Sequence, residues 1–168
     1  MTILGIDPGL ATVGYGIIDV NNDKYLVKKV GVIQTSSETR FSKRLHTIYL
    51  EMQDLIREFK PDEIAIEELF FSKNTKTAMI VSQARGVLIL SCVGKDIPIY
   101  EYTPLQIKQG ITGSGRADKS QVTKMVTYIL GLESSPKPDD AADALAIAVC
   151  HANQTQNLKK MNFINREI

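Results

Sequence analysis

Apolar residues recur along the chain in two rhythms, and each rhythm predicts a different kind of element. Short apolar runs bounded by turn residues such as Asn, Asp and Gly are typical of strands. Apolar residues spaced three or four apart are typical of helices. The strands predicted in this way span residues 2–6, 13–20, 25–34, 63–66 and 97–100. The predicted helices span residues 38–60, 74–93, 117–130 and about 139–153.

The order of these elements predicts an α/β fold. Three strands precede the first helix, strands and helices then alternate, and two helices end the pattern. Such an order favours one five-stranded mixed sheet flanked by helices on both faces. We expect a single domain over residues 1–153. The tail at 154–168 is rich in Asn, Gln and Lys, and we expect it to carry too little apolar surface for a firmly ordered structure.

The composition favours a cytoplasmic protein without a membrane partner. Hydrophobic residues make up 43% of the chain, and no apolar run approaches the roughly 20 residues that cross a bilayer. The N-terminal residues enter a strand-like run without the basic region and cleavage site of a signal peptide. Cys92 and Cys150 lie in apolar surroundings without CxxC spacing, so we expect buried thiols in a reducing compartment.

The net charge of +1 hides an uneven distribution of charge. Residues 69–95 and 102–132 are predominantly basic, whereas acidic residues gather at 51–68 and 139–143. A basic run is often only a solvated face. Two such runs beside a group of carboxylates favour a polyanionic partner.

Four acidic residues stand where an unpaired carboxylate is costly. Asp7 and Glu67 end two predicted strands that can lie parallel and adjacent, so both would reach the same edge of the sheet. Asp140 and Asp143 lie three apart on one face of a helix that continues into the apolar run 144–150. Carboxylate oxygens are the ligands that Mg²⁺ prefers, and four carboxylates suit two ions that act on a phosphodiester.

Each of these acids also has a simpler reading. Asp7 can shape the Asp-Pro-Gly turn, Asp140 can be a first-turn acid that the helix dipole favours, and Glu67 can face solvent. Asp143 has the weakest simpler reading, because it lies farther into the helix beside the apolar run. His151 lies about 12 Å beyond Asp143 along that helix, so we expect a structural or surface role for it.

Basic residues flank a glycine-bearing loop at 110–115. Lys108, Arg116 and Lys119 lie before, beside and after this loop, and a helix follows it. Backbone amides at a helix N-terminus, together with Lys or Arg side chains, form sites for phosphate groups. These three residues are therefore predicted to contact nucleic acid.

Several motifs, in order and at matching spacing, resemble the bacterial Holliday junction resolvase family, RuvC. They are LGIDPG followed by GYG, AIEELFF with SKN, QARG, GSGRADKSQV and DDAADALAIA, and they extend from about Ile3 to His151. The resemblance implies an RNase H-like fold, a homodimer, and nicking of two opposed strands of a four-way DNA junction. It implies two Mg²⁺ ions per subunit, with Mn²⁺ as a substitute, and a RuvA–RuvB branch-migration complex as a further partner.

The resemblance also implies roles for single residues around the acids. Asp7, Glu67, Asp140 and Asp143 match the catalytic, metal-binding acids of the family, and Lys108 and Lys119 match lysines near its active site. Phe70 would stand exposed as a wedge that stacks on or displaces a base at the crossover, with Phe71 in the core.

The long helix at 74–93 is placed by the resemblance in the dimer interface. Its small residues Ala78, Ser82 and Gly86 are spaced four apart, which would let another helix come close. Packing of this helix on the protein's own sheet is the alternative. The role of Arg85 in QARG stays open between a structural and an interface one.

Two other function classes compete with a junction resolvase. One is another RNase H-like nuclease that acts on RNA precursors or on simple branched DNA. The other is an actin-like ATPase, whose first phosphate loop also has an Asp-containing turn after a strand. The length of 168 residues counts against the ATPase, because those proteins hold nucleotide between two copies of the fold.

Overall fold

One five-stranded mixed sheet forms the centre of the molecule. The computed structural model describes residues 1–21, 24–69, 75–93 and 96–164. The strands are β1 (Thr2–Asp7), β2 (Thr12–Asn21), β3 (Lys24–Gln34), β4 (Glu63–Glu67) and β5 (Ile99–Tyr102), in the order β3-β2-β1-β4-β5. Strand β1 is antiparallel to β2 and parallel to β4, and β4 is parallel to β5. The predicted α/β fold with a five-stranded mixed sheet is confirmed.

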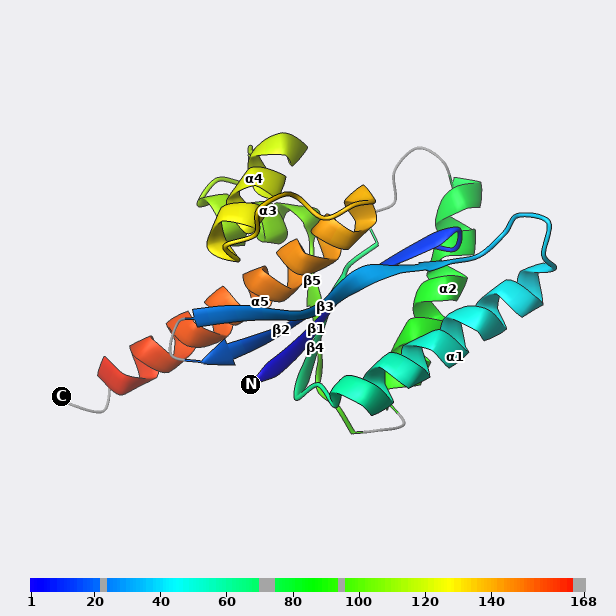
Figure 1. The fold of residues 1–168 in the computed structure, drawn as a ribbon, viewed down its shortest axis with the longest axis horizontal. Coiled ribbons are helices and arrows are strands. Elements are labelled where there is room, and N and C mark those ends of the chain that lie inside the picture. The colour runs from blue at the N-terminus through cyan, green and yellow to red at the C-terminus, as the bar shows by residue number, and fades with distance from the viewer. Residues whose placement is uncertain (22–23, 70–74, 94–95, 165–168) are drawn as a thin grey trace.

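Helices cover both faces of this sheet (Figure 1). On one face lie α1 (Phe41–Phe59) and α2 (Thr75–Val93). On the other lie α3 (Pro104–Thr112), α4 (Lys119–Ile129) and α5 (Asp139–Ile164). In the described part of the chain, no helix is both long enough and apolar enough to span a bilayer.

Alternation along the strands divides the apolar side chains between two cores. Leu4 and Ile6 of β1 pack in the core shared with α1 and α2, whereas Ile3 packs in the core shared with α3, α4 and α5. In β4, Ala65 faces the α5 core. Because side chains two apart in a strand share a face, Asp7 and Glu67 at the ends of these strands face α5.

Helix α5 lies so close to the sheet that glycine is needed at two strand positions. A Cβ atom placed on Gly5 would stand 2.2 Å from the carbonyl oxygen of Ala144, and one on Gly14 would stand 2.0 Å from that of Asp140. Any side chain at these two positions would push the helix away. Close packing on this face, together with α3 and α4 on the outer side, explains why residues 144–150 are buried all round.

The structure differs from the sequence-based expectations in three elements. Helix α3 was not predicted, although Thr103 and Gln106 form a capping box with Pro104 at the first position. Strand β5 begins at Ile99, two residues later than expected. Helix α5 continues to Ile164, well beyond the expected end near 153. Residues 151–164 contain neither proline nor glycine, so nothing in their backbone chemistry ends the helix.

Candidate active site

The end of the β1–β4 pair brings two of the predicted acids together. Ile6 is paired with Ile66 in parallel register, so the next residues, Asp7 and Glu67, lie side by side at the carboxyl ends of their strands. The first turns of α5 cross this edge of the sheet and carry Asp140 and Asp143. All four predicted acids therefore reach one place, from two strands and one helix.

The four carboxylates act on one another electrostatically. The pKa of Asp7 is raised to about 7, first by burial and then by the negative charges of Glu67, Asp143 and Asp140. The pKa of Glu67 is raised by burial and by Asp143, against a hydrogen bond with Asp7 that lowers it. Burial and mutual repulsion therefore outweigh the positive charge near these two carboxyl groups.

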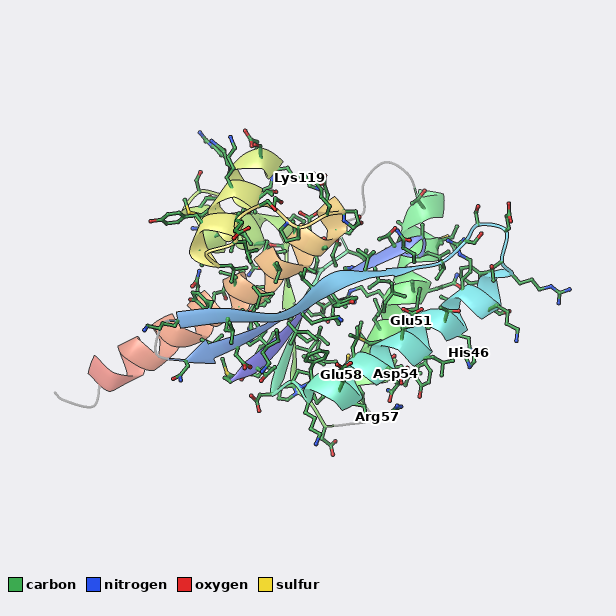
Figure 2. All side chains as sticks on the ribbon, in the orientation of Figure 1. His46, Glu51, Asp54, Arg57, Glu58 and Lys119 are labelled. Carbon is green, nitrogen blue, oxygen red and sulfur yellow. The ribbon has the colours of Figure 1, made fainter. Side chains whose placement is uncertain are left out.

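Lys119 supplies part of the missing positive charge. Its Nζ donates to Asp143 Oδ2 at 2.8 Å and lies 3.8 Å from Asp139 Oδ2. The hydrogen bond to Asp143 raises the pKa of Lys119, so its ammonium group stays charged. Figure 2 shows Lys119 at the start of α4, on the side of the sheet that carries α5.

The donor set fits a hard divalent cation, but the side chains do not form a ready coordination shell. Among the described residues, no three His, Cys, Asp or Glu side chains are grouped closely enough to count as a metal-binding cluster. The fit rests on chemistry: all four acids offer oxygen ligands, and a cation would relieve the repulsion that raises the pKa of Asp7.

A groove of about 280 Å³ opens beside the acids. Glu67 and Asp143 line it together with both predicted DNA-contacting lysines, Lys108 and Lys119. Arg116 is not brought to this place, because it lines a separate surface groove beside Lys124, Met125 and Tyr128. Phe70 and Phe71 lie outside the described residues.

Arg85 supports the end of β4 from the other face of the sheet. Its Nε donates to the backbone carbonyl of Glu67 at 3.3 Å, and its Nη2 lies 2.6 Å from Glu101 Oε2 on β5. The sequence left open whether Arg85 is structural, and the structure places its side chain, 15% exposed, in this contact. Nothing in the local pattern around Arg85 signals a partner 18 residues away.

His151 is buried, which fits the structural role and not the surface role that the sequence left open. Its Nε2 lies 2.7 Å from Glu63 Oε2, and its Nδ1 lies 2.6 Å from the Tyr102 hydroxyl. Glu68 and Asp139, which stand next to Glu67 and Asp140 in the sequence, are both exposed.

Comparison with known proteins places this geometry in a family. The family model for crossover junction endodeoxyribonuclease RuvC matches residues 3–151. A crossover junction endodeoxyribonuclease RuvC from Finegoldia magna is 59% identical over 151 residues, which cover 90% of this chain and 92% of the relative.

Solved structures agree with the sequence relatives. A Thermus thermophilus RuvC structure is similar with a TM-score of 0.87 at 34% identity, covering 93% of this chain and 96% of the other. A structure of T. thermophilus RuvC in complex with a Holliday junction substrate is similar with a TM-score of 0.86 at 32% identity, with the same coverage. The fold, the position of the acids and these relatives agree, and the chain belongs to the crossover junction endodeoxyribonuclease RuvC family.

Proposed function

We propose that this protein resolves four-way DNA junctions by hydrolysing a phosphodiester in each of two opposed strands. The convergence of four carboxylates beside a lysine-lined groove carries the proposal, because phosphodiester hydrolysis needs both metal ligands and charges that hold phosphate. Membership of the RuvC family and the similarity to a RuvC bound to a Holliday junction substrate support the choice of DNA substrate.

The proposed cofactor is Mg²⁺, two ions per subunit, with Mn²⁺ as a substitute. Asp7, Glu67, Asp140 and Asp143 would hold the ions, which when bound would activate a water molecule and stabilise the leaving oxygen. Lys108 would neutralise phosphate in the groove.

Lys119 has a double role in this proposal. Its ammonium group pairs with Asp143. When cations satisfy the carboxylates, that ammonium group is available to DNA phosphate at the start of α4, where backbone amides also favour anions.

The dimer in this proposal is formed through α2. Its exposed stripe consists of Met79, Ser82, Gly86, Leu90 and Val93, and the three large apolar side chains are each more than half exposed. A Cβ atom on Gly86 would meet nothing within 4 Å, so a second helix has room to approach there. Of the predicted small residues, Ala78 is half-buried and lies off this stripe. Two opposed strands call for a two-fold enzyme.

Light scattering tests the dimer. The wild-type chain should have the mass of a dimer, and Gly86→Arg should reduce it towards the monomer because the new side chain occupies the approach path. A monomeric wild type, both free and on a junction, would contradict the interface.

Two proposals taken from the resemblance need their own experiments. If Phe70 is a wedge, Phe70→Ala should sharply reduce junction nicking, because base–aromatic stacking contributes about 1–3 kcal/mol. The melting temperature of the protein should not fall. For the RuvA–RuvB complex, co-sedimentation of this protein with RuvA and RuvB on junction DNA is the direct measurement.

Incubation with a synthetic four-way junction and a matched linear duplex tests the central proposal. With Mg²⁺, the junction should be nicked in pairs of opposed strands, and the duplex should stay intact. Without divalent metal, neither DNA should be cut. Cleavage of a structured RNA precursor in preference to the junction would instead favour the rival nuclease.

A further inference from the structure

A second groove reaches Asp140, one of the four acids, from the opposite face of the sheet. It has a volume of about 420 Å³, and Asp140 lines it. Its other walls come from the turn between β1 and β2, from Arg44 on α1 and from the N-terminal part of α2. The lysine-lined groove is instead walled by α3, α4 and α5. The helices that wall the two grooves lie in opposite layers of the fold (Figure 1).

Arg44 of α1 carries the positive charge among the described residues that line this second groove. Its Nε donates to Thr35 Oγ1 at 2.8 Å. The Thr35 hydroxyl donates in turn to the carbonyl of Leu10, and the Thr35 amide donates to that of Ala11 at 2.9 Å. The guanidinium is thus held against the turn that immediately follows Asp7.

The outer end of the guanidinium remains available. In the described part of the chain, no carboxylate lies within 4.0 Å of Arg44, and Nε is the atom that makes its side-chain hydrogen bond. An arginine fixed through Nε still presents both terminal nitrogens, which is the fork that matches a phosphate group.

A DNA strand that crosses the acids has to continue past them in both directions. Lys108 and Lys119 can neutralise its phosphates on one side. On the other side the strand would meet Asp140 and uncharged residues unless a cation compensates, and Arg44 is placed to do so.

We propose that Arg44 binds a backbone phosphate of the DNA strand, on the side of the acids opposite to Lys108 and Lys119. The inference rests on the proposed function, since it concerns the same DNA substrate. It makes Arg44 a DNA-binding residue, whereas the competing role is to tie α1 to the β1–β2 turn.

Binding isotherms over a range of salt concentrations, without divalent metal, distinguish the two roles. Arg44→Gln should weaken binding to the four-way junction by about 10-fold or more, as for the loss of a charge-assisted hydrogen bond. The slope of log K against log salt should become shallower by about one unit for each bound subunit, because fewer counterions are released.

Arg57→Gln is the matched control, because it removes the same charge from the same helix. Arg57 is exposed and pairs with Asp54 at 2.9 Å, towards the other end of α1 (Figure 2). It should leave the slope unchanged. Arg44→Lys should retain the slope but recover only part of the affinity, since an ammonium group cannot bind in the same two-point way.

An unchanged slope and affinity in a folded Arg44→Gln variant would overturn the proposal. If Arg44→Gln does not fold, Arg44→Lys decides, and an affinity equal to that of the wild type would overturn it. A wild type that binds junction and duplex equally would overturn the junction preference alone, because the Arg44 slope can be measured on either DNA. A wild type that binds neither would overturn both proposals.

Discussion

Glu63 and Glu67 are both glutamates on the same face of strand β4, but their neighbours differ. One faces a histidine and the other faces carboxylates. Glu63, at the start of β4, faces His151 at 2.7 Å, and His151 also contacts the Tyr102 hydroxyl. Glu67, at the other end of β4, faces Asp7 and Asp143, and its pKa is raised by burial and by the charge of Asp143. Helix α5 supplies both neighbourhoods, with its acids at one end and its histidine further along.

The two glutamates differ in their partners, histidine for Glu63 and carboxylates for Glu67. Glu63 is 20% exposed at its side chain, so it is itself largely covered, but its hydrogen-bond partner satisfies it. Paired polar groups in a core contribute to the fold, whereas uncompensated carboxylates cost free energy unless a ligand balances them. One strand thus carries a carboxylate paired with histidine and, four residues later, one that faces other carboxylates.

The largest expected effect comes from neutralising one glutamate at a time. Glu67→Gln should reduce Mg²⁺-dependent junction nicking by more than about 100-fold, since loss of even an outer-shell partner of a metal costs about 10–100-fold. Glu63→Gln should leave nicking within a few-fold of the wild type. Single-turnover cleavage of a labelled junction measures both. Equal losses in the two variants would contradict the comparison.

Arg85 touches the backbone of Glu67, so its removal should disturb one glutamate only. Arg85→Met should reduce nicking by about 10–100-fold and raise the Mg²⁺ concentration that gives half-maximal activity. Excess Mg²⁺ should recover part of the loss, and Arg85→Lys should be milder. A loss of activity that follows the melting temperature and ignores Mg²⁺ would show general destabilisation instead.

Removing the histidine partner of Glu63 should lower the stability of the protein. His151→Phe leaves Glu63 and the Tyr102 hydroxyl without their partner, and should lower the free energy of unfolding by about 1–3 kcal/mol. Urea denaturation followed by circular dichroism measures this loss. The Mg²⁺ concentration that the folded variant needs for nicking should equal that of the wild type. A changed concentration would show that His151 influences the acids at the start of α5.

The smallest effect concerns stability without metal, and it has a defined pH window. The pKa of Asp7 rises on folding from 3.8 to about 7, so its protonated form favours the fold. This contribution is complete below pH 3.8 and is lost as the pH rises through about 7. Asp7→Asn should therefore raise the melting temperature of the metal-free protein at pH 8, and by less at pH 5.

Mg²⁺ provides the control for that prediction. At pH 8 it should raise the melting temperature of the wild type, because binding to the folded state stabilises it. It should raise that of Asp7→Asn by less, because one oxygen ligand is replaced by a neutral amide. An equal Mg²⁺ effect in both proteins would remove Asp7 from the metal site.

Local sequence determined the elements and the candidate acids, because both obey short-range rules. Strand and helix periodicity predicted the five strands and the long helices, and the strand ends and the three-residue spacing singled out Asp7, Glu67, Asp140 and Asp143. Helix α3 was not predicted, although the residues of its capping box can be recognised in the sequence. The end of α5 was predicted too early, because its polar residues were interpreted as a tail.

The tertiary structure alone decided which charged residues have partners. The contact of Glu63 with His151 joins residues 88 apart, and that of Arg85 with Glu67 joins residues 18 apart. Arg116 and Lys119 are three apart in the sequence, yet they line different grooves. Periodicity describes which face a residue occupies, whereas pairing depends on what the fold brings against that face. Here the close approach of α5 at Gly5 and Gly14 brings its acids and His151 against the sheet.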